Sequence, residues 1–229
     1  MTGIICAMDL ELEGFLKNMS VEETLERSGM TFYKGKIKNS EAVIAQCGVG
    51  KVNAAICTQI MIDFFAPQLI VNSGVAGALD ERLTVCDLVI GDFALQHDMD
   101  GTALGEEKGN LDLGGEQRVR LPLDRETSEK LMKLAENYEG SRVYLGTVAS
   151  GDKFVSDTRE RLSIGRQFDA LACEMEGASM AHVCYRAKVP CAIVRAISDD
   201  LTHNTGMSFN EFKYIACEKT VLLLLGLFE

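Results

Sequence analysis

The sequence predicts an α/β protein: one domain over residues 1–229, with a central mixed β-sheet flanked by helices. Short apolar runs typical of buried strands alternate with segments of helical spacing, which favours a parallel or mixed sheet between helical layers. No internal repeat, linker or low-complexity tract divides the chain. A chain of 229 residues is long enough for one such domain and should bury roughly 70% of its unfolded surface.

The N-terminal half alternates strand-like runs with two helical segments. Residues 48–50 have neither the Walker spacing nor that of a dinucleotide fingerprint, so we interpret them as a tight turn into a helix. Residues 73–77 are interpreted as a small-residue turn after a strand. The expected strands cover 3–7, 32–37, 42–46, 69–72 and 88–95, and the expected helices cover 9–19 and 51–65.

The C-terminal half begins with a segment, 101–115, that is rich in glycine and acidic residues and has little periodicity. Long irregular loops are uncommon in compact domains unless they are functional, so we expect a mobile loop near a binding site. A capping box, Ser208 followed by Glu211, predicts the start of the last helix. Between these segments we expect a helix at 125–138, strands at 143–149, 168–173 and 191–197, and a tightly packed helix after Glu176.

Composition and charge argue against several classes of function. The net charge is −11 and no dense Lys/Arg run is present, so we expect no nucleic-acid partner. The eight cysteines lack CxxC spacing and lie mostly in apolar runs, which indicates reduced, buried side chains rather than zinc ligands. We see no signal peptide and no apolar run of the ~20 residues that a membrane span requires. We therefore expect a cytoplasmic protein with no membrane partner.

Acidic residues follow several of the predicted strands. Glu11 comes just after the first run, Glu174 and Glu176 follow the run 168–173, and Asp199 follows the run 191–197. In open α/β sheets, ligands bind beyond the carboxyl ends of the strands. A charge at the end of an apolar strand is costly unless it is paired or functional, and for Asp199 we favour function. The pattern predicts acid/base chemistry on a small molecule.

Some of these charged residues also have a structural interpretation. Glu174 and Glu176 can be helix-start acids stabilised by the helix dipole, although the small residues after Glu176 fit this less well. Arg195 can either form a buried pair with a carboxylate or belong to the site. His97 and Asp98 resemble part of a metal cluster, but a second cluster at ligand spacing is missing. We expect a hydrogen-bonded structural pair there and no metal.

Seven motifs, in order, resemble the purine nucleoside phosphorylase/nucleosidase superfamily, and within it the 5′-methylthioadenosine/S-adenosylhomocysteine nucleosidases. The resemblance covers nearly the whole chain. It implies a nucleoside phosphorylase-like fold and hydrolysis of an adenine N-glycosidic bond without a cofactor. The motifs lie at 3–8 with Glu11, 48–55, 72–77, 97–98, 150–154, 174–178 with 181–184, and 194–199 with 208–209.

Carried over position by position, the resemblance gives three carboxylates catalytic roles. Asp199 would protonate N7 of adenine with support from Ser198, and general acid help of this kind typically gives about 10²–10⁴-fold. Glu11 would activate the water that attacks C1′. Glu176 would bind the ribose hydroxyls and favour the cation-like transition state, while Met175 would pack against the ribose.

The resemblance also implies a nucleoside pocket around these acids. Phe154 and the backbone of Val155 would hold the purine, and Phe209 would cover the 5′ side. Leu104, in the loop 101–115, would approach the 5′ substituent from the partner subunit of a homodimer. Further contacts to the nucleoside are expected from Ala7, Val49, Val75, Ala76, Gly77, Glu174 and Arg195.

Two features favour hydrolysis over phosphorolysis. Phosphorylase relatives place an Arg just before the small-residue segment, where this chain has Asn72. They also carry a basic residue near the end of the first strand, where this chain has Asp9, Glu11 and Glu13. An acidic edge is a poor phosphate site.

The expected substrates are 5′-methylthioadenosine and/or S-adenosylhomocysteine, with 5′-deoxyadenosine as a further candidate, and the products are adenine and a 5-thioribose derivative. Leu104 and Glu106 stand where the family usually has aromatic residues, so the preferred 5′ group stays open. The alternatives are a purine nucleoside phosphorylase, a nucleosidase for another purine nucleoside such as futalosine, and a nucleoside-binding protein without catalysis.

Overall fold

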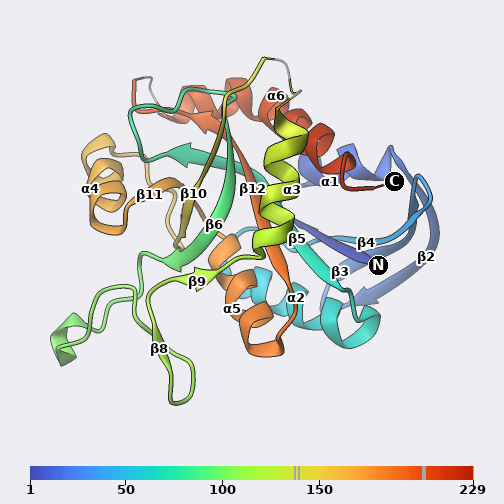
Figure 1. Cartoon of the computed structure of the whole chain (residues 1–229), viewed down its shortest axis with the longest axis horizontal. Helices are drawn as coiled ribbons and strands as arrows, with labels where there is room; N and C mark the ends of the chain where they lie inside the picture. The colour runs from blue at the N-terminus through green and yellow to red at the C-terminus, as the bar shows by residue number, and fades with distance from the viewer. Residues whose placement is uncertain (137, 139, 203–204, 229) are drawn as a thin grey trace.

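The computed structural model has the α/β architecture that the sequence predicts, a central mixed sheet with helices on both faces (Figure 1). It describes residues 1–136, 138, 140–202 and 205–228, the last range without the side chains of 205–208. The predicted fold class is confirmed. The strands are β1 (Thr2–Cys6), β2 (Met19–Arg27), β3 (Met30–Ile37), β4 (Ser40–Gln46), β5 (Leu69–Ala78), β6 (Leu88–Gln96), β7 (Leu111–Asp112), β8 (Gln117–Arg118), β9 (Leu121–Pro122), β10 (Val143–Ser150), β11 (Ala170–Glu174) and β12 (Cys191–Asp199).

The main sheet combines parallel and antiparallel pairs. Its ten strands follow the order β11-β10-β6-β12-β5-β1-β4-β3-β2, with β9 beside β6. β11 also pairs antiparallel with β5, so the strands β5, β12, β6, β10 and β11 close into a ring. The parallel neighbours β1, β5 and β12 end at the same edge of the sheet, which brings the residues that follow them together.

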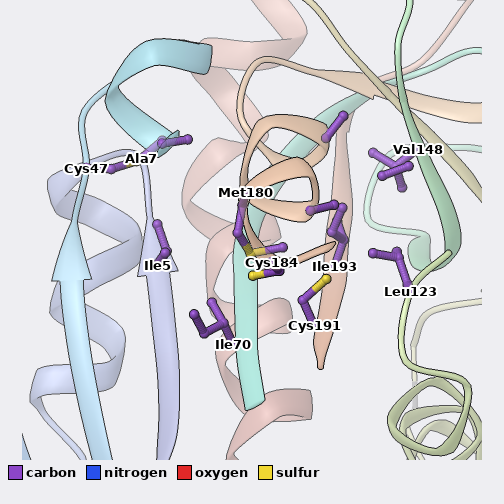
Figure 2. Close-up of a cluster of buried hydrophobic side chains, with 14 of the residues drawn as sticks. Ile5, Ala7, Cys47, Ile70, Leu123, Val148, Met180, Cys184, Cys191 and Ile193 are labelled. Carbon is purple, nitrogen blue, oxygen red and sulfur yellow. The ribbon is translucent and has the colours of Figure 1, made fainter. Parts of the chain in front are cut away.

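The helices cover both faces and one end of this sheet (Figure 1). α2 and α5 pack on one face, where Figure 2 shows Met180 and Cys184 beside Ile70 and Ile193. α1, α3 and α6 pack on the other face, and α4 lies against β11. The helices are α1 (Asp9–Leu16), α2 (Lys51–Phe65), α3 (Arg125–Ala135), α4 (Thr158–Phe168), α5 (Gly177–Ala187) and α6 (Thr205–Leu225), with a 3₁₀ turn η1 (Thr102–Leu104).

Several predicted elements differ from the structure. The turn predicted at 73–77 is wrong, because these residues continue β5 and pair with β12 along its length. The sequence prediction missed β2, whose side chains are mostly exposed, and α4, which buries only Arg161, Ile164 and Phe168. α6 begins at Thr205, so Ser208 lies inside its first turn and the predicted capping box is misplaced.

The segment 101–115 was expected to be a loop near the site. It contains η1 and β7, and β7 pairs with β8. The segment between β6 and β8 projects from the rest of the chain (Figure 1). Leu104, at the end of η1, is 85% exposed.

The described residues contain neither a membrane-spanning helix nor a cluster of metal ligands. No helix among them combines the length and apolar character needed to cross a membrane. Within the same part of the chain, no group of three or more His, Cys, Asp or Glu side chains is placed to hold a metal ion.

Candidate active site

A pocket of about 370 Å³ opens where β1, β5, β11 and β12 end. Its volume lies in the range of small-molecule sites, and most of its wall is apolar. Thirteen of the predicted site residues line it: Ala7, Glu11, Val49, Val75, Ala76, Gly77, Phe154, Glu174, Met175, Glu176, Ser198, Asp199 and Phe209. Met8 and Cys173 also line it; the sequence interpretation missed both, although each adjoins a predicted site residue.

Glu11 is held in the pocket wall by backbone N–H groups. It stands in the first turn of α1, where its Oε2 accepts hydrogen bonds from the N–H groups of Ala7 (2.8 Å) and Met8 (3.1 Å). Val75 donates a third, of 3.3 Å, to Oε1. Burial raises the pKa of Glu11, although Arg195 and these N–H groups oppose the rise. A carboxylate with a raised pKa accepts a proton more readily than an ordinary one.

Glu174 and Arg195 form a buried ion pair behind the pocket. Glu174 ends β11, and its carboxylate also accepts the N–H groups of Glu176 and Gly177 at the start of α5 and the hydroxyl of Ser150. Burial raises the pKa of Glu174, but Arg195 and these donors outweigh that effect and lower it. Both interpretations of Glu174 therefore apply, because it caps a helix and also lines the pocket.

Arg195 supplies positive charge to the whole group of acids. Its side chain is buried, and Nη2 donates to Glu174 and to Oδ1 of Asn72. Burial lowers the pKa of Arg195, but Glu174, Glu176 and Glu11 raise it above its usual value. Arg195 does not line the pocket, so the structure supports the buried pair expected as its structural role.

Glu176 lies at the start of α5, and its pKa is raised. Gly50, in the turn before α2, donates its N–H to Oε1 of Glu176 at 2.8 Å. Burial and the neighbouring Glu174 raise the pKa of Glu176 to about 7. A carboxyl that titrates near 7 in a pocket is typical of functional sites.

Asp199 ends β12 at an irregularity in the strand. The pairing of β12 with β5 shifts between Ile197 and Asp199, and such bulges re-aim a side chain. Ser198 donates its hydroxyl to Oδ1 of Asp199 at 2.7 Å. Oδ2 pairs with Arg161 of α4, a residue that the sequence interpretation did not identify. No local pattern marks Arg161, because only the packing of α4 brings it to Asp199.

Besides Arg195, two of the predicted site residues lie off the pocket. Val155 is buried behind it, and its carbonyl accepts a 2.8 Å hydrogen bond from Arg161 Nε. Leu104 is exposed and does not line the pocket of its own chain. Phe154, by contrast, is half-exposed at the mouth, edge-on to the ring of Phe209 with centroids 5.6 Å apart. These two rings form an apolar wall.

The turn before α2 is tied to two loops beside the pocket. Lys51 donates its N–H to Asp152 (2.8 Å) and its Nζ to Asp98 (2.6 Å). Asp98 in turn accepts the N–H of Asp152 at 2.9 Å. Asp98 was expected to pair with His97, but its carboxylate accepts hydrogen bonds from Lys51 and Asp152. These bonds fix Val49 and Gly50 at the pocket.

A second hollow, of about 640 Å³, lies between α5 and the segment 113–124. Several of its polar residues have structural partners: Asp124 caps α3, Arg186 donates to the carbonyl of Leu113, and Tyr185 donates to Glu116. None of the predicted site residues lines it. The smaller pocket, with its perturbed carboxyl groups, is therefore the candidate active site.

The fold and the pocket define the class of protein. Residues 2–229 match the family model described as the phosphorylase superfamily, and the chain belongs to this superfamily. Within it, the chain is 38% identical over 216 residues to a 5′-methylthioadenosine/S-adenosylhomocysteine nucleosidase of Staphylococcus haemolyticus, covering 93% of this chain and 92% of the relative. The family resemblance seen in the motifs is confirmed.

Solved structures of two related enzymes share the fold of this chain. A Helicobacter pylori nucleosidase mutant, solved with 5′-methylthioadenosine in its active site, superposes with a TM-score of 0.91 and 32% identity, covering 98% of this chain and 96% of that one. A futalosine hydrolase of H. pylori superposes with a TM-score of 0.90 and 31% identity, covering 97% and 94%.

Proposed function

We propose that this protein is an N-glycosyl hydrolase that cleaves the bond between adenine and ribose in 5′-methylthioadenosine and/or S-adenosylhomocysteine. One observation carries the proposal: Glu11, Glu176 and Asp199, from three distant parts of the chain, line a single pocket. The similarity to nucleosidases of that name supports the choice of nucleoside. The products are adenine and a 5-thioribose derivative.

In this mechanism Asp199 is the general acid. As the C1′–N9 bond breaks, its electron pair moves into the purine ring and Asp199 gives a proton to N7, so adenine leaves as a neutral base. The hydroxyl of Ser198 supports the carboxyl at 2.7 Å. General acid catalysis of this kind contributes about 10²–10⁴-fold.

Glu11 acts as the general base. It takes a proton from a water whose oxygen forms the new bond to C1′. Three backbone N–H groups orient the Glu11 carboxylate, and its raised pKa suits proton uptake. Glu176 binds the ribose hydroxyls, and its negative charge stabilises the positive charge that develops at C1′ in the transition state.

Apolar walls hold the two ends of the nucleoside. Phe154 and the backbone of Val155 contact the purine, Met175 packs against the ribose, and Phe209 covers the 5′ side. The edge-on contact between Phe154 and Phe209 supports this assignment, because it places both rings at the mouth of the pocket. The remaining lining residues named above complete the contacts.

The pocket is completed by a homodimer in this proposal. Val52 and Ile56 form an apolar stripe on the exposed side of α2, next to Val49 at the pocket. A second copy covering this stripe buries it and brings its own Leu104, which is exposed and does not line the pocket of its own chain, towards the 5′ group. A cytoplasmic location remains a prediction.

The direct test is adenine release from 5′-methylthioadenosine with and without phosphate, with chromatography of the sugar. Phosphate-independent release of free methylthioribose is the expected result. D199N should lower kcat by about 10²-fold or more. D169N is the control, because Asp169 is exposed and its left-handed backbone suits Asn. Unchanged turnover in D199N would overturn the acid assignment.

The similarity to a futalosine hydrolase favours a second substrate class, another purine nucleoside such as futalosine. Turnover of futalosine but not of 5′-methylthioadenosine would select it. Phosphorolysis is disfavoured by Asn72, which is buried and donates its amide to the carbonyl of Ile5 at 2.9 Å, away from the pocket. Ribose 1-phosphate among the products would reverse that conclusion.

A further inference from the structure

Arg161 is a buried cation next to the pocket that the proposed mechanism does not use. It lies on α4 with only 1% of its side chain exposed. Its Nη2 pairs with Oδ2 of Asp199, and its Nη1 donates to the main-chain carbonyls of Asp199 and Asp200, both at 3.3 Å. Its Nε donates to the carbonyl of Val155 at 2.8 Å. The guanidinium therefore joins the end of β12 to the loop that follows Phe154.

The surrounding chain leaves room for this pair. A side-chain carbon on Gly77 would lie 2.7 Å from Nη2 of Arg161 and 3.0 Å from Oδ2 of Asp199. Gly77 pairs directly with Asp199 across β5 and β12. The absence of a side chain at Gly77 thus lets the guanidinium reach the carboxylate at the wall of the pocket.

We propose that Arg161 is a positioning residue for Asp199, which it holds in register with the purine-binding loop around Val155. Arg161 does not line the pocket, so it acts through Asp199 and not on the substrate. A planar guanidinium can hold a carboxylate and several carbonyls at once because its five N–H donors are fixed in one plane. This proposal rests on the function proposed above, in which Asp199 is the acid.

The arrangement has a consequence for proton transfer. The guanidinium and the Ser198 hydroxyl both favour the charged form of a carboxylate, whereas a general acid must be protonated when the base leaves. Arg161 therefore improves the orientation of Asp199 but lowers the fraction of Asp199 that carries a proton at a given pH. Without the cation, the carboxyl group of Asp199 is less well oriented, but it stays protonated to a higher pH.

The test compares R161M, R161Q and R161K with the wild type. The matched control is R166M, which removes the same charge from the exposed side of the same helix. Each protein is assayed for kcat, KM and the pH profile of kcat/KM with 5′-methylthioadenosine, and its folding is checked by circular dichroism. R161Q replaces R161M if R161M does not fold.

In R161M or R161Q, kcat should fall about tenfold or more with a smaller change in KM, as misplacement of a catalytic group causes. The basic limb of kcat/KM should move up by about one pH unit. R161K keeps the charge but not the fork of donors, so its basic limb should stay in place and its kcat should recover in part. R166M should match the wild type. A wild-type kcat in R161M, or a lower kcat with an unmoved pH profile, overturns the proposal.

A second readout separates this proposal from the proposed function. If the wild type releases no base from 5′-methylthioadenosine, the function fails, but the carboxyl of Asp199 can still be titrated by ¹³C NMR, with D199N to assign its signal. A higher titration midpoint in R161M or R161Q than in the wild type supports the pairing on which the positioning role depends. An unchanged midpoint overturns it whether or not the enzyme is active.

Discussion

The backbone N–H of Gly50 donates a 2.8 Å hydrogen bond to Oε1 of Glu176, which lies 126 positions away in the chain. Gly50 precedes α2 and Glu176 precedes α5, so this bond fixes the starts of two packed helices at the pocket. Gly50 has a φ of 104°, and a side-chain carbon there would lie 3.2 Å from Oδ1 of Asp152. The position therefore favours glycine for both its backbone and its neighbours.

Replacing Gly50 by alanine should disturb Glu176 directly. We expect G50A to destabilise the protein by about 1–3 kcal/mol and to lower kcat/KM about tenfold or more, since the carboxylate loses its fixed orientation. Adenine release and urea unfolding measure the two effects. The control is G29A, because Gly29 also has a positive φ, of 74°, but has no atom within 4 Å of the added carbon. An equal loss of kcat/KM in G29A would contradict the assignment.

The raised pKa of Glu176 makes stability depend on pH. The folded state holds a proton up to about 7 that the unfolded state releases near 4.5, so the free energy of unfolding falls as the pH rises between these values. E176Q lacks this titration and should become more stable than the wild type by about 3 kcal/mol at pH 8, with the difference vanishing near pH 4.

Urea unfolding across this pH range measures the effect. E41Q, at an exposed position of β4, should follow the wild type throughout. A difference between E176Q and the wild type that does not change with pH would show that Glu176 titrates normally.

The buried pair of Arg195 and Glu174 should contribute far more to stability than an exposed one. R195M leaves the Glu174 carboxylate buried without its cation and should cost about 3–5 kcal/mol in the free energy of unfolding. R125M breaks the exposed Arg125–Glu129 pair on α3 and should cost at most about 1 kcal/mol. The double variant R195M/E174Q should lose less than the sum of the single variants, because no unpaired charge remains. Additive losses would mean that the pair is not coupled.

The apolar stripe on α2 tests the proposed dimer. V52E/I56E places charge on exposed positions outside the pocket and should convert a dimer into a monomer, as measured by light scattering. KM for 5′-methylthioadenosine should rise, because Leu104 of a partner no longer reaches the 5′ group. V21E, on the exposed strand β2, is the control. A wild-type monomer with full activity would refute the dimer.

Local patterns in the sequence were sufficient for much of the fold. The helix predicted at 51–65 matches α2 at both ends, because a glycine turn precedes it and Pro67 follows it. The strand β2 was missed because its side chains are mostly exposed and show no apolar alternation. The helix α4 was missed although Asp157 caps it and its buried residues keep helical spacing. The run 73–77 resembles a turn in composition, and its pairing with β12 makes it a strand.

The sequence by itself determined the α/β class and the acids at the ends of strands, because burial of a sheet imposes a periodicity that can be read locally. Only the tertiary structure decided what those acids do to one another. Glu174 and Glu176 are two positions apart, yet Arg195 lowers the pKa of Glu174 while burial raises that of Glu176 to about 7. Arg161 reaches Asp199 only through the packing of α4. Desolvation and charge pairing depend on distances in space, and a local sequence pattern does not contain those distances.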